Sequence, residues 1–378
     1  MKRIALVCAG GMHQALHIAP VAVSLSQIEG SQVAAFVLNR ADQVAFELLL
    51  TRLGDIRIDI QVMAVPRLLE WLLALPVLLR AGKGVRLLFW NRSIGRYDAV
   101  LAAERTTTIL KNLPWWRVPM IHIPHGAGDR AKGFEPRLAR FDHIIVSGPK
   151  DRQRMIAQGL VAPDNCTVSG SIKVAACKTM QRDAAPLFDN ARPTIIYNPH
   201  FDHGLGSFSR FAAALIDAVI ACDQFNLIVA PHIRMFEAAS LAERDEWQKL
   251  AVPGQVIIDL ASPRLSDMSY TNAADIYLGD VSSQVYEYLT VLRPCVFINA
   301  HNVVWRGDPN YAMWQFGPVC NDVPHVMRAL EMAGETHAAY IENQRIMVAD
   351  ALGDHGDQAP KIAARQLLDA IARFSQPA

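Results

Sequence analysis

The sequence of 378 residues has no Cys-x-x-Cys pair, no apolar run long enough to span a membrane and no excess of charge. Its six cysteines are scattered, several of them in apolar stretches, as buried free thiols in a reducing compartment are. The net charge of +1 gives no basic surplus for nucleic acid. The apolar run at residues 4–9 is too short for a signal peptide. We therefore expect a cytoplasmic protein that does not bind nucleic acid.

Several catalytic motifs are also missing. The chain has no Walker loop, no zincin motif and no nucleophile elbow. His200 and His203 are three residues apart, but the glycines beside them predict a turn rather than a helix that could present two metal ligands. We therefore predict no metal site.

The length and the apolar composition predict two globular domains. In the first domain, residues 1–178, a buried strand at 4–8 precedes a glycine turn and a helix at about 14–28. Strand, glycine turn and helix in this order are typical of the start of a doubly wound α/β domain.

Residues 194–350 repeat this plan after a polar segment that we interpret as a linker. Residues 351–378 are predicted to form a C-terminal helix that returns to the first domain. The fold class predicted from this alternation is α/β, with two doubly wound, Rossmann-like domains that face a cleft.

The stretch at residues 273–299 predicts a strand, a tight turn, a helix and a further strand. A helix start presents unpaired N–H groups, and the hydroxyls of Ser282 and Ser283 add donors there, so the turn suits a phosphate or diphosphate. Glu287, one turn further on, could reach sugar hydroxyls of the same ligand. In the simpler interpretation, Asp280 or Ser282 only caps the helix.

Histidines follow three of the predicted strands. His125 is in the first domain, whereas His200 and His232 are in the second. Because strand ends of an open α/β sheet line the binding crevice, these side chains are candidate site residues. Gly11 and His13, after the first strand, are weaker candidates, since a tight turn or a helix start can carry them without a functional role.

Residues 65–90 are rich in leucine and tryptophan, with Arg67, Arg80, Lys83 and Arg86 on either side. This composition is typical of a helix that lies in a membrane interface. It is equally typical of a buried helix or of an oligomer contact, and the sequence leaves the two interpretations open.

The run from Asp280 to Tyr288, together with Ala-Pro-His232 and Ile-Pro-His125-Gly, resembles the CDP-glycerol glycerophosphotransferases, a family of GT-B transferases. The segment Gly353–Asp357 before the last predicted helix also resembles that family. The resemblance extends over roughly residues 120–370, and it adds a family to the two-domain α/β fold predicted above.

The resemblance implies a GT-B transferase that moves a glycerophosphate-like or glycosyl group from a nucleotide-diphosphate donor to a hydroxyl acceptor. The donor would be CDP-, UDP- or GDP-linked, no cofactor would be bound permanently, and the product would belong to cell-envelope polymer or glycolipid synthesis. A lipid-linked acceptor would place the protein on the inner face of the membrane, with residues 65–90 in contact with the lipid.

The resemblance also implies roles for particular residues. His125 would be the general base, His232, Ser282 and Ser283 would hold the donor diphosphate, and Glu287 would contact the ribose. The full set of candidates is His125, His232 and Asp280 as catalytic residues, and Gly11, His13, His200, Ser282, Ser283 and Glu287 as residues that bind the nucleotide.

Three alternatives remain. The first is a glycosyltransferase that uses a UDP or GDP sugar. The second is an isomerase like the UDP-N-acetylglucosamine 2-epimerases, because residues 122–130 distantly resemble theirs, although Pro124 and His125 stand where that family has an acidic residue. The third is a GT-B scaffold that binds a carrier or partner without catalysis.

Overall fold

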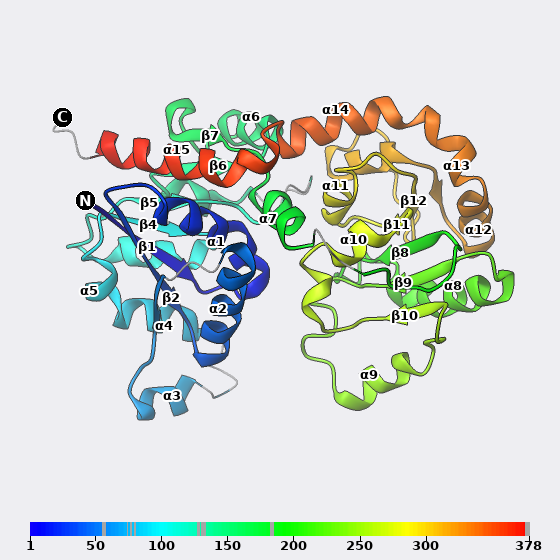
Figure 1. The fold of residues 1–378 in the computed structure, drawn as a ribbon, viewed down its shortest axis with the longest axis horizontal. Coiled ribbons are helices and arrows are strands. Elements are labelled where there is room, and N and C mark those ends of the chain that lie inside the picture. Colours follow the sequence, from blue (N-terminus) through cyan, green and yellow to red (C-terminus); the bar gives the residue numbers. More distant parts are fainter. Residues whose placement is uncertain are drawn as a thin grey trace. The chain divides into compact units, whose positions relative to one another are not determined.

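The computed structural model describes residues 1–54, 58–73, 75, 78, 81–126, 129, 134–181 and 185–374. The chain forms two compact units, each with its own parallel sheet (Figure 1). The first unit comprises Met1–Ala127, Phe134–Met180 and Ala351–Ala378, and the second comprises Gly128–Gly133 and Gln181–Asp350.

The described part of the first unit has a seven-stranded parallel sheet in the order β3-β2-β1-β4-β5-β6-β7. Its strands are β1 (Lys2–Cys8), β2 (Ser31–Val37), β3 (Asp59–Val62), β4 (Ala99–Ala102), β5 (Met120–His122), β6 (His143–Val146) and β7 (Cys166–Val168). The order reverses between β1 and β4, which are paired from Ile4 opposite Ala99 to Val7 opposite Ala102.

Helices connect these strands. They are α1 (Met12–Ser26), α2 (Arg40–Gly54), α3 (Arg67–Leu73), α4 (Gly82–Phe89), α5 (Asn91–Ile94), α6 (Pro149–Ala157), α7 (Ile172–Met180) and α15 (Ala359–Phe374), with 3-10 helices η2 (Arg105–Asn112), η4 (Pro136–Arg140), η5 (Pro163–Asn165) and η9 (Gly356–Gln358). The last helix, α15, drawn in red in Figure 1, packs on α1 and α7 of this unit.

The described part of the second unit has a six-stranded parallel sheet in the order β10-β9-β8-β11-β12-β13. Its strands are β8 (Thr194–Asn198), β9 (Asn226–Val229), β10 (Val256–Ile258), β11 (Ile276–Gly279), β12 (Cys295–Ile298) and β13 (Val319–Cys320). This is the 3-2-1-4-5-6 order of a dinucleotide-binding sheet, and it reverses between β8 and β11.

The helices of this unit are shorter on average. They are α8 (Phe208–Cys222), α9 (Leu241–Gln248), α10 (Ser269–Ala273), α11 (Gln284–Tyr288), α12 (Val323–Glu331), α13 (Ala333–Thr336) and α14 (Ile341–Leu352), with 3-10 helices η6 (Pro263–Leu265), η7 (Pro309–Phe316) and η8 (His337–Ala339).

Both sheets are covered on two faces, and their strand sequences show why. Residues 4–7 of β1 and 227–229 of β9 are continuous apolar runs in which every side chain is fully buried. Continuous rather than alternating apolar residues are typical of parallel strands between two helix layers. The predicted α/β fold with two doubly wound sheets is therefore confirmed.

The alternation of strands and helices in the sequence also predicts a helix at about 264–272 and another that starts at Thr106, and the structure differs at both. The first is interrupted, because the Asp267 carboxylate accepts hydrogen bonds from the backbone N (3.0 Å) and the hydroxyl (2.5 Å) of Ser269, and Met268 adopts a φ of 66°. The second is the 3-10 helix η2 rather than an α-helix. The short strand β13 and the helix α9 were not predicted.

Candidate functional site

The turns after β8, β9 and β11 carry most of the candidate residues of the second unit. His200 follows β8, His232 follows β9, and Asp280 follows β11 directly. These strands are neighbours in the sheet, and β8 and β11 are the pair at which the strand order reverses. Their carboxyl ends therefore meet where ligands bind in open α/β sheets.

Asp280 is fully buried and organises this edge of the sheet. Its Oδ1 accepts the backbone N–H of His200 (2.9 Å) and of Val281 (2.6 Å), and its Oδ2 accepts the backbone N–H (2.7 Å) and the hydroxyl (2.9 Å) of Ser207. The Trp314 indole donates to the Asp280 carbonyl at 2.6 Å. Burial raises the pKa of this carboxyl, and the hydrogen bonds that it accepts oppose the shift.

These contacts make Asp280 a residue that positions the β8 turn. Both carboxylate oxygens already have donors, and the side chain is inaccessible to solvent. Gly206 lies in the same turn, where an added Cβ would lie 2.2 Å from the His200 carbonyl oxygen. The turn is thus packed too closely for any side chain at this position.

His200 and His232 have the same local geometry. Nδ1 of His200 accepts the backbone N–H of Asp202 (3.1 Å), and Nδ1 of His232 accepts that of Arg234 (3.2 Å). An accepting Nδ1 places the proton of a neutral ring on Nε2, so both rings are N–H donors at Nε2. The ring centroids are 6.0 Å apart, so the structure brings the two predicted residues together.

An aromatic side chain and an arginine complete this histidine pair, and sequence reasoning missed both. The Phe201 ring lies 4.4 Å from the His200 ring and 4.8 Å from the His232 ring, between centroids. The exposed Arg234 guanidinium lies over Phe201, 4.5 Å from its centroid. Arg234 could have been included among the candidates from the sequence, because it follows His232 by two residues.

Ser282, Ser283 and Glu287 lie in the turn and helix after β11. The helix α11 has only five residues, so its dipole is weaker than the predicted helix would supply. Ser282 is 3% exposed and accepts the Gln284 N–H at 3.4 Å through its hydroxyl. Ser283 is half-buried, and Glu287 is 9% exposed. The hydroxyls, rather than the dipole, are therefore what this turn could offer an anion.

In the first unit, the candidates follow β1 and β5. Gly11 has a φ of 86° and precedes α1, and His13 is the second residue of that helix. His125 is exposed, and its Nδ1 lies 3.2 Å from the Ala103 carbonyl oxygen after β4. The rings of His13 and His125 meet edge to face, with centroids 5.8 Å apart. Two predicted residues from distant parts of the sequence are thus neighbours.

Buried titratable groups surround this pair. His17, on α1, is 7% exposed, and burial lowers its pKa well below the ordinary value, with further lowering by Lys173, His125 and His13. Lys173 itself is 6% exposed. Arg130, which falls in the stretch compared with the epimerases, and Arg80 lie outside the described residues.

Glu104, which follows β4, was not among the predicted site residues. Its side chain is 7% exposed, and burial raises the pKa of its carboxyl, opposed first by Lys83. A carboxylate two residues beyond the end of a strand at the reversal point is a signal that could have been used.

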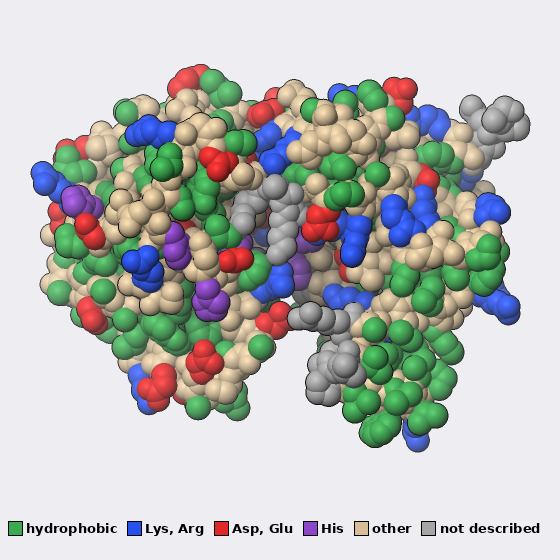
Figure 2. Space-filling view, turned by 180° about the vertical axis from the view of Figure 1, so that it is seen from behind, with side chains coloured by type: hydrophobic (Ala, Val, Ile, Leu, Met, Phe, Trp, Pro, Cys, Tyr) green, Lys and Arg blue, Asp and Glu red, His purple; other side chains and the backbone are tan. Residues whose placement is uncertain are grey.

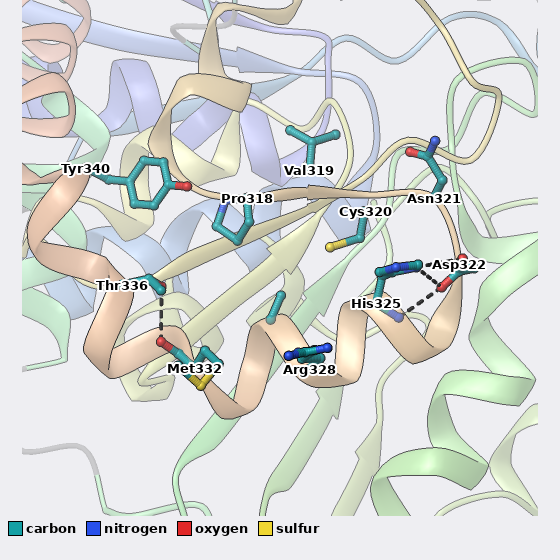
Figure 3. Close-up of a pocket in the computed structure, with 11 residues that line it drawn as sticks. Pro318, Val319, Cys320, Asn321, Asp322, His325, Arg328, Met332, Thr336 and Tyr340 are labelled. Carbon is teal, nitrogen blue, oxygen red and sulfur yellow. Dashed lines mark hydrogen bonds and ion pairs between the residues drawn. The ribbon is translucent and has the colours of Figure 1, made fainter.

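A pocket of about 520 Å³ lies elsewhere, between the edge strand β13 and the helices α12 and α13 (Figure 3). His325 and Asp322 at its rim are hydrogen-bonded to each other, with Nδ1 2.7 Å from Oδ1. None of the predicted site residues is among the described residues that line it. The strand-end residues, not this pocket, are therefore the candidate site.

The described residues contain no group of three or more His, Cys, Asp or Glu side chains placed to hold a metal ion. Within the described ranges, no helix combines the length and the apolar character that a membrane crossing requires.

Neither a protein-family model nor a curated protein matches the sequence. Solved structures do match along the whole chain. The UDP-GlcNAc 2-epimerase from Neisseria meningitidis, bound to UDP-GlcNAc, is 15% identical with a TM-score of 0.62, covering 98% of this chain and 100% of that one. The S. aureus MnaA–UDP structure is 13% identical with a TM-score of 0.65, covering 100% and 99%.

A third similar structure is the wall teichoic acid polymerase TagF with CDPG, at 12% identity and a TM-score of 0.64, covering 99% of this chain and 90% of that one. At these identities the matches show a shared fold. The chain therefore has the two-domain GT-B fold that the sequence predicted.

Proposed function

We propose that the protein is a transferase that moves a glycerophosphate-like or glycosyl group from a nucleotide-diphosphate donor to a hydroxyl acceptor. The observation that carries this proposal is the histidine pair of the second unit. His200 and His232 each have Nδ1 bonded to the backbone, so each has an Nε2–H donor, and they lie together at the strand-order reversal.

The surroundings of the pair suit a diphosphate. Arg234 adds a positive charge beside Phe201, and Ser282 and Ser283 add hydroxyls after the neighbouring strand β11. N–H donors, a guanidinium and hydroxyls are the groups that bind phosphate oxygens. In this proposal Asp280 positions the β8 turn and does not touch the substrate, whereas Glu287 contacts the ribose.

The acceptor side is assigned to the first unit. His125 is exposed after β5, and it contacts the Ala103 carbonyl through Nδ1, so Nε2 is the ring nitrogen that would take a proton when Nδ1 donates. His13 lies edge to face with this ring and orients it. An acceptor hydroxyl that attacks the donor would transfer its proton to His125 as the bond between the transferred group and the nucleotide breaks. The nucleotide leaves as the monophosphate when glycerophosphate is transferred, and as the diphosphate when a sugar is transferred.

The fold neighbours support the donor class without deciding between bases. One neighbour structure holds UDP-GlcNAc, a second holds UDP and a third CDPG. A thermal-shift screen with CDP, UDP, GDP, CMP and ADP is the direct test. The proposal expects stabilisation by at least one diphosphate, less by CMP, and loss of that stabilisation in His232→Ala. If no nucleoside diphosphate binds the wild-type protein, the proposal is wrong.

A second candidate function is epimerisation of a nucleotide sugar. It is favoured by the full-length match to 2-epimerases, one of which was solved with UDP-GlcNAc. Incubation with UDP-GlcNAc and NMR detection of its 2-epimer separates the two functions. An epimerase produces the epimer without an acceptor, whereas a transferase releases the nucleotide only when an acceptor hydroxyl or water attacks.

The proposed acceptor is lipid-linked, because the first unit exposes apolar side chains at residues 65–90. Leu68 is 72% exposed and Trp71 is 64% exposed on α3, and Leu75 follows nearby. Figure 2 shows hydrophobic side chains gathered in this region, at its lower right. Arg86 contributes less charge than the sequence indicated, because it is paired with Glu70.

We predict that the wild-type protein co-sediments with anionic vesicles and that Trp71→Glu combined with Leu72→Glu abolishes this binding, since charges do not enter the interface at low cost. Nucleotide binding should be unchanged. Val304→Glu is the matched control, because Val304 is 91% exposed in the second unit. Absence of co-sedimentation by the wild type would reassign α3 to an oligomer contact.

A further inference from the structure

Glu104 is a buried carboxylate of the first unit whose side chain lacks part of its bonding among the described residues. It lies two residues after β4, beside β1 in the sheet, and is 7% exposed. Its Oε1 is buried, with no hydrogen-bond partner among the described residues.

The groups near this carboxylate do not complete its bonding. Lys83 and the hydroxyls of Thr106 and Thr107 lie close enough to favour the ionised form, yet Oε1 accepts no hydrogen bond from any described residue. Arg105, the next residue in the chain, is directed to Glu135 at 3.4 Å. A buried acceptor without a donor is destabilising, so its retention requires an explanation.

The position of Glu104 in the sheet offers an explanation for this buried acceptor. Glu104 follows the strand at which the order of the first sheet reverses, and its neighbour Ala103 contacts His125 through the carbonyl oxygen at 3.2 Å. The Glu104 backbone is thus one residue from the group that holds the proposed base. A ligand that reaches His125 approaches the same edge of the sheet.

We infer that Glu104 is an acceptor-binding residue, and that Oε1 accepts a hydrogen bond from a hydroxyl of a neutral polyol at the reacting end of the acceptor. This inference rests on the proposed transferase function. It adds a substrate class, since a buried carboxylate favours hydroxyl donors and disfavours a phosphate at the same position by charge repulsion. The reacting end is therefore glycerol-, ribitol- or sugar-like and carries no phosphate next to the attacking hydroxyl.

The test uses the full-length protein, with saturation-transfer NMR to measure binding of glycerol, ribitol and sn-glycerol 3-phosphate. We expect wild type to bind a neutral polyol in preference to the phosphate. Glu104→Gln should weaken polyol binding by roughly 10- to 100-fold, the loss that accompanies removal of a hydrogen bond to a charged group. It should also reduce the discrimination against the phosphate.

Two comparisons make the result specific. Glu29→Gln is the matched control, because Glu29 is an exposed carboxylate of the same unit, and it should leave polyol binding unchanged. Glu104→Ala, which leaves no amide in the buried site, should repeat the loss if the Gln variant is unstable. Equal binding of polyol and phosphate by wild type, or unchanged polyol binding in a folded Glu104 variant, overturns the inference, and the wild-type comparison requires no variant.

Nucleotide binding, measured on the same samples, separates this inference from the proposed function. If CDP or UDP binds but no polyol does, the Glu104 inference fails and the donor assignment stands. If polyols bind in a Glu104-dependent manner but no nucleotide binds, the transferase proposal fails and Glu104 remains a hydroxyl-binding residue.

Discussion

The two sheets of this protein have the same strand order around their reversal points. A buried carboxylate follows a strand at each reversal point, but the hydrogen bonds that the two carboxylates accept differ. In the second unit, Asp280 receives hydrogen bonds from three backbone amides and a hydroxyl of the protein itself. In the first unit, Glu104 keeps one oxygen without any described partner. One carboxylate therefore holds the backbone in place, whereas the other keeps a buried oxygen whose hydrogen-bond donor we infer to be a ligand.

The burial of histidine side chains also differs between the two units. His17, His122 and His143 of the first unit are buried, whereas every described histidine of the second unit is at least partly exposed. Burial lowers the pKa of His122 to about 3 and that of His143 to about 4. The first unit thus carries neutral rings in its interior, and the second presents its rings at the surface.

The largest expected effect is acid unfolding of the first unit. Histidines with lowered folded-state pKa values do not affect stability above about pH 6.5, where the ring is neutral in both states. They destabilise the fold as the pH falls towards 4, because the unfolded chain takes up protons that the buried rings do not. Each lowers the free energy of unfolding by up to about 1.4 kcal/mol per pH unit, or about 4 kcal/mol per pH unit for the three. Raised pKa values at Asp42 and Glu104 offset part of this loss.

Hydrogen exchange measured by mass spectrometry at pH 7, 6 and 5 distinguishes the units. Peptides of β1, β5 and β6 should lose protection before those of β8, β9 and β11. If the second unit opens first, the assignment of acid sensitivity to buried histidines is wrong.

Removal of the Asp280 carboxylate should have the next largest effect. Asp280→Ala leaves three amides and a hydroxyl without their acceptor, which should lower the free energy of unfolding by about 3–5 kcal/mol. Asp280→Asn keeps one acceptor oxygen and should cost about 1–2 kcal/mol. Urea unfolding monitored by fluorescence measures both. An Ala variant as stable as wild type would show that the turn after β8 does not depend on this residue.

Loss of the proposed base should affect turnover alone. His125→Ala should reduce turnover by roughly 10²- to 10⁴-fold with nearly unchanged donor affinity, because a general base acts in the transition state. His13→Ala, which removes only the neighbouring ring, should reduce it less. Steady-state kinetics with the donor found in the nucleotide screen provides the measurement. Full activity in His125→Ala together with loss in His13→Ala would exchange the two roles.

The smallest effect is expected at the serines. Ser282→Ala combined with Ser283→Ala should weaken nucleotide binding by about 1–3 kcal/mol, as expected for lost hydrogen bonds to a charged group. Titration calorimetry with the same nucleotide tests this. Thr290→Ala provides a control in the same region, since its hydroxyl is bonded to the Glu287 carbonyl at 2.9 Å. Unchanged affinity in the folded double variant would remove the serines from the donor site.

Sequence patterns predicted the strands well, and with them the meeting of His200, His232 and Asp280 at one sheet edge. The apolar run Cys295–Ile298 is the whole of β12, and Leu227–Val229 makes up β9 apart from Asn226. The functional roles of the candidate residues stay predictions. The sequence patterns could not show the hydrogen-bond partners of Asp280. Ser207 and His200 are 73 and 80 residues away, and contacts at that separation leave no local pattern in the sequence.

The same limit applies to Glu104. A carboxylate after a strand is visible in the sequence, but the missing partner of its Oε1 depends on how Arg105, Lys83 and Thr107 are placed in three dimensions. Helix α11 is a further case. The apolar side chains of Val285, Tyr286 and Leu289 are spaced as in a helix, but the helix has only five residues and ends at Tyr288, and this early end could not be predicted from the spacing.

The long separation between Asp280 and its partners has a consequence for synthesis of the chain. A nascent polypeptide that has emerged only as far as Gly279 already contains His200, Ser207 and His232, but it lacks the carboxylate that orders the turn after β8. Because loops of this length must close before the contact forms, that turn can be fixed only after β11 has paired with β8. A ribosome-bound fragment ending before Asp280 would therefore carry the histidines without the carboxylate that accepts the N–H groups of His200 and Ser207.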